Sequence, residues 1–248
     1  MNLADALLPL LPDGRGVIAF VGAGGKTTAL FRLARELAPR PVLLTTTTHL
    51  ADPRLEPGRE GRMVFDPALE GPFTGGPVPP AAPGLTILMA READAPGKVK
   101  GIHPSWIPVL RGSWGLVLVE ADGSRRLPVK APAPHEPVLP PGTDLVVGVV
   151  GLDCLGRPLD GTVAHRPGLF AEITGCAPLE PIRWEHLAAL VRHPRGLFKD
   201  ARGARVLLLN KADTLGALPP LAGLFPGRVL LGSLLAPDGV ILVEEDAP

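Results

Sequence analysis

One glycine-rich stretch, followed by a lysine and two threonines, has the composition of a phosphate-binding loop. It reads Gly22-Ala-Gly-Gly-Lys-Thr-Thr28. Glycines let backbone N–H groups curl around phosphate oxygens, and a helix that starts at the loop adds the positive end of its dipole. In such loops the lysine contacts the β- and γ-phosphates, and the hydroxyl after it ligates Mg²⁺. We therefore predict that the phosphates of a nucleoside triphosphate bind Gly22, Ala23, Gly24, Gly25, Lys26, Thr27 and Thr28.

This loop departs from the full phosphate-loop pattern at one position. The pattern G-x-x-x-x-G-K-S/T requires a glycine where this chain has Phe20. A structural turn with an incidental lysine is the alternative interpretation. However, the apolar run Val17–Val21 predicts a strand before the loop, and the apolar spacing over Ala29–Leu37 predicts a helix after it. Strand, glycine turn and helix in this order favour phosphate binding.

Two carboxylates follow a second apolar run, Leu116–Val119, which is typical of a buried strand. At the end of such a strand, one carboxylate holds Mg²⁺ and a neighbouring one positions the attacking water. A pair of structural acids is the alternative, but the phosphate-loop pattern favours the metal site. We predict a metal site of Thr27, Glu120 and Asp122, and catalytic roles for Lys26, Glu120, Asp122 and Arg125.

A cationic, proline-stiffened segment comes directly after these acids. It carries Arg125, Arg126 and Lys130. Cations at this place neutralise the charge of a transferring phosphate or bind an anionic substrate. A solvated charged loop remains the alternative interpretation.

The sequence Asn210-Lys-Ala-Asp213 matches the N-K-x-D box of GTPases and follows the apolar run Ala204–Leu209. In that box the aspartate accepts hydrogen bonds from the guanine N1–H and 2-amino groups. Adenine lacks both donors, so the carboxylate would face an acceptor instead. We predict that Asn210, Lys211 and Asp213 bind the base, and that the nucleotide is GTP rather than ATP.

Strand-like runs alternate with helical ones along the chain. We predict strands near residues 17–21, 41–48, 85–89, 116–119, 144–150, 204–209, 229–231 and 240–243, and helices near 1–15, 29–37, 168–174 and 183–191. This alternation predicts an α/β fold in which a mostly parallel sheet is covered by helices on both faces, as in three-layer P-loop NTPases. We expect a single domain over 1–248, with an irregular, lid-like insertion near 50–84 that is rich in proline, glycine and charge.

Composition excludes several classes of partner. Basic and acidic residues balance at 25 each, so nothing indicates nucleic acid or an anionic membrane as a partner. No apolar run approaches the length of about 18 residues that a membrane span needs. The first residues have no basic segment of a signal peptide, so we expect a cytoplasmic protein. Cys154 and Cys176 lack metal-ligand spacing, which favours buried free thiols.

Five motifs occur in one order along the chain: V-G-A-G-G-K-T-T at 21–28, T-T-T-T-H at 45–49, V-E-A-D-G-S-R-R-L-P-V-K-A-P at 119–132, H-E-P-V at 135–138 and L-N-K-A-D at 209–213. In this the sequence resembles the YqeC-type selenium-dependent molybdenum hydroxylase accessory proteins, also called selenium cofactor biosynthesis proteins. The resemblance implies a P-loop NTPase fold and a role in maturing these hydroxylases. It also implies a molybdenum hydroxylase or another maturation factor as the partner.

Three functions are consistent with these residues. The first is Mg²⁺-dependent binding and hydrolysis of a nucleoside triphosphate, with GTP preferred, in the maturation of a selenium-dependent molybdenum hydroxylase or its cofactor. The second is a small-molecule kinase or nucleotidyl transferase that acts on an anionic acceptor. The third is a non-hydrolysing module that docks on a partner when nucleotide is bound.

Overall fold

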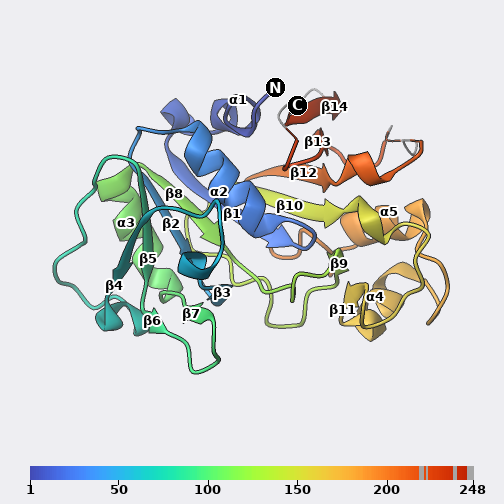
Figure 1. The fold of residues 1–248 in the computed structure, drawn as a ribbon, viewed down its shortest axis with the longest axis horizontal. Coiled ribbons are helices and arrows are strands. Elements are labelled where there is room, and N and C mark those ends of the chain that lie inside the picture. Colours follow the sequence, from blue (N-terminus) through green and yellow to red (C-terminus); the bar gives the residue numbers. More distant parts are fainter. Residues whose placement is uncertain (218–220, 222, 237–238, 245–248) are drawn as a thin grey trace.

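The computed structural model describes residues 1–217, 221, 223–236 and 239–244, and its centre is one large sheet. Its strands are β1 (Gly16–Gly22), β2 (Val42–Thr46), β4 (Arg62–Phe65), β5 (Leu85–Met89), β8 (Leu116–Glu120), β10 (Leu145–Gly151), β12 (Ala204–Asn210), β13 (Arg228–Gly232) and β14 (Val240–Glu244). In space they follow the order β14-β13-β12-β10-β1-β8-β2-β5-β4 (Figure 1). All neighbours pair in parallel except β13 and β14, which run antiparallel. The predicted α/β fold with a mostly parallel sheet is therefore confirmed.

Helices cover both faces of this sheet. They are α1 (Leu3–Leu7), α2 (Lys26–Glu36), α3 (Ile107–Trp114), α4 (Pro167–Thr174) and α5 (Trp184–Arg192). Successive side chains of a strand point to opposite faces, so β1 contributes to two cores. Ile18 and Phe20 join the core under α1 and α2, whereas Ala19 and Val21 join the core under α4 and α5. Among the described residues, no helix combines the length and the apolar character that crossing a bilayer requires.

The register of the parallel strands brings the predicted motifs to one edge of the sheet. Phe20, two residues before the glycine loop, pairs with Glu120 at the end of β8. On the other side of β1, Gly22 pairs with Val149 of β10. The end of β10 in turn pairs with Asn210 at the end of β12. The phosphate-loop, acid and base-binding motifs therefore share the carboxyl edge, where parallel α/β proteins bind ligands.

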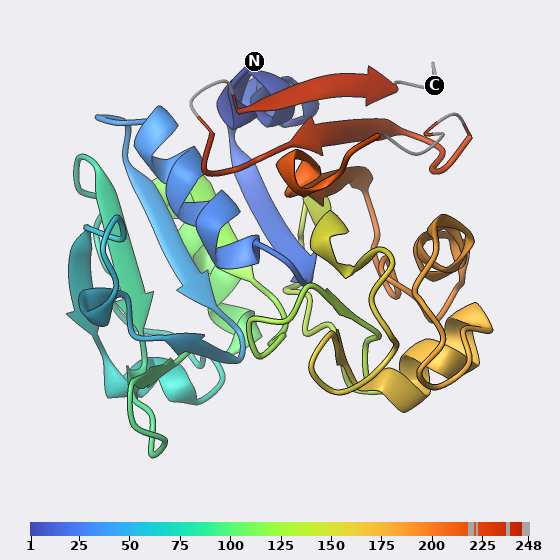
Figure 2. The ribbon, with the colours of Figure 1, turned by 45° about the vertical axis from the view of Figure 1, so that its right-hand side comes forward.

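Two small sheets stand at this edge and were not predicted. One consists of β3 (His49–Ala51), β6 (Arg91–Glu92) and β7 (Lys98–Lys100), and the other of β9 (Val129–Lys130) and β11 (Ala164–His165). Figure 2 shows both below the ends of the large strands. The predicted insertion near 50–84 begins within β3 and contributes β4, the edge strand of the main sheet; much of the rest is irregular chain with short 3-10 turns.

Candidate functional site

The glycine loop is a tight connection whose glycines are required by close packing. Backbone φ is +92° at Gly22 and +80° at Gly24, both in the range that glycine adopts readily. A Cβ at Gly22 would lie 2.3 Å from the carbonyl oxygen of Val149, and one at Gly24 would lie 2.2 Å from the nitrogen of Gly151. Phe20 stays in β1 and is fully buried, so the turn begins two residues later than in the full pattern.

The backbone N–H groups of this loop divide into two sets. Those of Gly22, Ala23 and Gly24 donate inward, to Asp122 Oδ2, to the Val149 carbonyl and to the Leu127 carbonyl. The first N–H groups of α2 have no partner within the helix, because an α-helix leaves its N-terminal donors unpaired. The donors left unpaired are therefore those that start α2 at Lys26, while the three preceding N–H groups hold the loop in place.

Lys26 and Asp122 form a buried ion pair under the loop. Lys26 Nζ donates to the Gly22 carbonyl at 2.5 Å and lies 3.1 Å from Asp122 Oδ1, with both side chains 2% exposed. The second carboxylate oxygen, Asp122 Oδ2, lies 2.9 Å from Lys130 Nζ. Asp122 thus sets the position of two lysines and of the loop backbone. Each carboxylate oxygen of Asp122 therefore lies beside one of the two lysines.

Thr27 and Glu120 make the second contact between the loop and β8. The Thr27 hydroxyl donates to Glu120 Oε2 at 2.7 Å. Burial raises the pKa of the Glu120 carboxyl, while the charge of Lys26 opposes this shift. A hydroxyl and a carboxylate are the oxygen donors that Mg²⁺ prefers. Of the three residues predicted to bind the metal, the structure therefore brings Thr27 and Glu120 together, whereas Asp122 contacts Lys26 and Lys130.

Part of the N-K-x-D segment is buried in the fold, and part of it is exposed to solvent. Asn210 is 5% exposed; its Nδ2 donates to the Gly24 carbonyl at 2.7 Å, and its Oδ1 accepts the Leu234 N–H at 2.9 Å. Lys211 Nζ lies 2.7 Å from Oδ2 of Asp153, which follows the end of β10 by two residues. Asp213 is exposed. Asn210 thus ties the box to the glycine loop, while the carboxylate of Asp213 is open to solvent.

These groups open into one cleft of about 1030 Å³. Its volume is at the upper end of the range of roughly 300–1,000 Å³ that small-molecule sites span. The predicted site residues that line it are Gly24, Gly25, Lys26, Thr27, Thr28, Glu120, Arg125, Asn210, Lys211 and Asp213. Gly22, Ala23 and Asp122 lie beneath this surface, where they are buried. Of the threonine cluster at the end of β2, Thr48 lines the cleft, whereas Thr45 and Thr46 donate to the Leu88 and Glu120 carbonyls.

Several cations on the wall of the cleft have left-handed backbone conformations. Seven described non-glycine residues have positive φ, and four of them are Arg125, Arg126, Arg166 and Lys211. All four line this cleft. The left-handed conformation costs about 1–2 kcal/mol per non-glycine residue, so the surrounding structure must hold it in place. Concentration of this strain on cations at one cleft indicates a site that is shaped for an anion.

A buried ionic network beside the cleft was not predicted as part of the site. Lys130 Nζ lies 2.7 Å from Glu136 Oε2, and Arg166 contacts both oxygens of the same carboxylate at 2.6 and 3.0 Å. Burial alone would raise the pKa of Glu136, but these two cations outweigh it and hold the pKa at about 2. Burial and the nearby cations Arg166 and Lys130 lower the pKa of His165 to about 4, so this ring is neutral at pH 7. The H-E-P-V motif at 135–138 was the sequence signal for Glu136.

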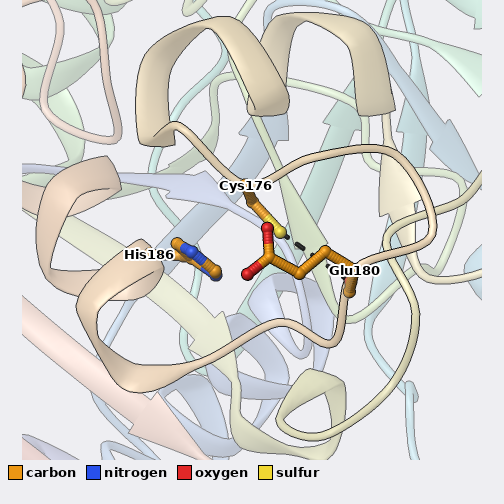
Figure 3. Close-up of side chains that lie close together, drawn as sticks. All are labelled: Cys176, Glu180 and His186. Atoms are coloured by element: carbon orange, nitrogen blue, oxygen red, sulfur yellow. Dashed lines mark hydrogen bonds between the residues drawn. The ribbon is translucent and has the colours of Figure 1, made fainter.

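A second cluster of chemically active side chains lies away from this cleft, before and within α5 (Figure 3). Ligand atoms of Cys176, Glu180 and His186 approach within 4.8 Å of one another. However, His186 Nδ1 accepts the Arg183 N–H at 3.1 Å, which leaves the proton of the neutral ring on Nε2. The oxygens of Glu180 contact the Ala177 N–H and the Arg183 guanidinium. The cluster is therefore explained as a turn and a helix cap, and both cysteines are buried free thiols, as predicted.

Comparison with known proteins identifies one family. The model of the YqeC protein family matches residues 18–168, which contain the glycine loop, the acids of β8 and the network around Glu136. A protein of Escherichia coli (strain K12), named "Uncharacterized protein YqeC", is 40% identical over 203 residues, which cover 79% of this chain and 75% of that protein. No solved structure matches this chain.

Proposed function

This chain belongs to the YqeC family, and we propose that it binds and hydrolyses a nucleoside triphosphate with Mg²⁺, preferring GTP to ATP. One observation carries the proposal. A single cleft is lined by the start of α2 with Lys26, by the Thr27–Glu120 pair and by the exposed Asp213. These are the groups that the phosphates, the metal and the base of one nucleotide require.

At the phosphate end, positively charged groups held in fixed positions would bind the phosphates. Lys26 and the other residues at the start of α2 line the cleft, and an anion at a helix N-terminus is stabilised by both the unpaired N–H donors and the helix dipole. Asp122 holds Lys26 at the turn, so the ammonium is positioned before any ligand arrives. Arg125, on the wall of the same cleft, adds the cation that would balance charge on the terminal phosphate during transfer.

The Thr27 hydroxyl and the Glu120 carboxylate would hold Mg²⁺, directly or through water. Each group offers an oxygen as a metal ligand, and the two oxygens lie 2.7 Å apart beside the glycine loop. When bound, the ion would supply positive charge that neutralises the charge developing on the phosphate oxygens. Asp122 would serve this site indirectly, by fixing Lys26 and the Gly22 N–H.

The base end supports a preference for guanine. Asp213 is exposed on the cleft wall and Lys211 is held beside it by Asp153. A carboxylate in this place accepts two hydrogen bonds from guanine and meets only an acceptor in adenine. We therefore propose GTP as the preferred nucleotide.

We further propose that hydrolysis serves the maturation of a selenium-dependent molybdenum hydroxylase or its cofactor, in the cytoplasm. The motifs shared with the selenium-linked accessory proteins support this role. The partner would be the hydroxylase or another maturation factor. Affinity capture with the tagged chain loaded with a non-hydrolysable GTP analogue should retain this partner, and capture with GDP should not. Equal capture in both nucleotide states would contradict nucleotide-controlled docking.

The hydrolysis itself is tested by phosphate release from GTP with and without Mg²⁺. We expect Glu120→Gln to lower the rate at least tenfold and to raise the Mg²⁺ concentration needed for half-maximal rate. Glu172→Gln is the matched control, because Glu172 is half-exposed on α4 and does not line the cleft. Unchanged Mg²⁺ dependence in Glu120→Gln would remove Glu120 from the metal site.

A further inference from the structure

The cleft extends beyond the part that one nucleotide would fill. In the sheet, β12 with the base box lies to one side of β1, with β10 between them, and β8 and β2 lie to the other side. A nucleotide that joins Lys26 to Asp213 covers the β10 and β12 side. The cleft continues in the opposite direction, to Thr48 after β2, to His49 of β3 and to Lys98 of β7. We call this part, lined by Thr48, His49, Arg59, Lys98 and Arg126, the far arm.

The charged side chains of the far arm are cations. The carboxylates that line the whole cleft are Glu120, Glu136 and Asp213. Glu120 contacts Thr27, Glu136 is held by Lys130 and Arg166, and Asp213 belongs to the base box. Glu120 is also close enough to Arg59 for its charge to act on that guanidinium, whereas Lys98 and Arg126 are the exposed cations of the far arm. The arm is therefore electrostatically suited to an anion and unfavourable for a cation.

One carboxylate at the rim already bridges two of these cations. Glu56 Oε2 lies 2.8 Å from Arg59 Nη2, and Glu56 Oε1 accepts a hydrogen bond from Arg126. Arg126 is 75% exposed and has a φ of +62°. Its backbone is therefore held in a costly conformation, although its side chain makes a single contact among the described residues, with Glu56, at the surface. Two guanidiniums around one carboxylate form the arrangement that recognises carboxylate or phosphate groups of ligands.

We propose that the far arm binds a second, anionic small molecule beside the terminal phosphate of the nucleotide. Its carboxylate or phosphate group would be held by Arg126 and Lys98 and would replace Glu56 as the partner of Arg126. The Glu56 carboxylate thus occupies the position that the anionic group of the ligand would take. This proposal rests on the proposed function, because the nucleotide defines which part of the cleft remains open.

The test uses the full-length chain saturated with Mg²⁺ and a non-hydrolysable GTP analogue, so that the phosphate loop is occupied. Calorimetric titration with inorganic phosphate and, separately, with succinate distinguishes a phosphate ligand from a carboxylate ligand. We expect one probe to bind the wild type at least tenfold more tightly than it binds the double variant Lys98→Gln/Arg126→Gln. Glu56→Gln should tighten binding of the same probe severalfold, because it removes the competing carboxylate.

Arg202→Gln is the matched control, since Arg202 is exposed and lies outside the cleft, and it should leave probe binding unchanged. Affinity for the GTP analogue should be the same in the wild type and in Arg202→Gln. If the analogue binds but neither probe binds the wild type more tightly than the double variant, the far-arm proposal fails and the proposed function stands. If the wild type does not bind the analogue, both fail.

Discussion

The two ends of the cleft are built in opposite ways. At the phosphate end, Lys26, Asp122 and Lys130 are 1–2% exposed and pair with one another under the glycine loop. At the base end, Asp213 is exposed and Lys211 is 37% exposed. The phosphate end is therefore part of the folded core, whereas the base end presents side chains that the fold does not need. Substitutions should change stability and binding together at the first end, and specificity alone at the second.

The largest effect should come from Lys26→Ala. We expect GTP affinity to fall at least a hundredfold, because the cation held beneath the phosphate loop is removed. The free energy of unfolding should also fall, by about 3 kcal/mol, since removing one partner of a buried ion pair leaves the other undercompensated. Calorimetry and urea unfolding measure the two quantities. A variant that lost affinity at full stability would contradict a phosphate end built into the core.

Asn210→Ala should lower the stability of the fold, as substitutions at the phosphate end do, although Asn210 lies in the base box. It would leave the Gly24 carbonyl and the Leu234 N–H without their partner. Because unsatisfied buried polar groups are costly, we expect a loss of about 2 kcal/mol in the free energy of unfolding. Urea unfolding measures the loss. Unchanged stability would show that the box does not anchor the loop.

Asp213→Asn tests the opposite end. We expect GTP affinity to fall about tenfold, equivalent to about 1.4 kcal/mol, and affinity for xanthosine triphosphate to rise, because the amide can donate to the xanthine 2-oxygen. Stability should stay within about 0.5 kcal/mol of the wild type, as for other exposed substitutions. Competition binding with the two nucleotides is the measurement. A parallel loss of both would contradict base readout.

The last effect concerns pH. The Glu136 pKa is about 2 in the folded chain, against an ordinary value of 4.5, so its ionised form stabilises the fold. This contribution is complete above about pH 4.5 and is lost as the pH falls toward 2. The stability gap between wild type and Glu136→Gln should therefore be larger at about pH 6 than at about pH 3. A gap that does not change with pH would contradict the ionic network.

Strand and motif placement were predictable because they depend on local pattern. Buried parallel strands are continuous apolar runs, so β1, β8, β10 and β12 were placed within one or two residues of their observed bounds. The shared carboxyl edge followed from parallel topology. The small sheets were not predicted, since β9 and β11 have two residues each and form only through a pairing distant in sequence.

The roles within the motifs were less predictable. Glu120 and Asp122 are two residues apart and look equivalent in the sequence, yet one contacts Thr27 and the other Lys26. Nothing local distinguishes them, because the difference comes from Lys130, which reaches Asp122 from the following loop. In the same way, Glu56 reaches Arg126 across 70 residues. Contacts of this kind depend on tertiary packing that residue spacing does not encode.

The most direct test of a cleft that holds Mg²⁺–GTP between two ends is calorimetric titration of the wild type with GTP and ATP, each with and without Mg²⁺. GTP should bind at least tenfold more tightly than ATP, and removing Mg²⁺ should weaken GTP binding. Equal affinity for the two nucleotides would contradict guanine readout by Asp213. Absence of binding to either nucleotide would contradict the nucleotide site as a whole.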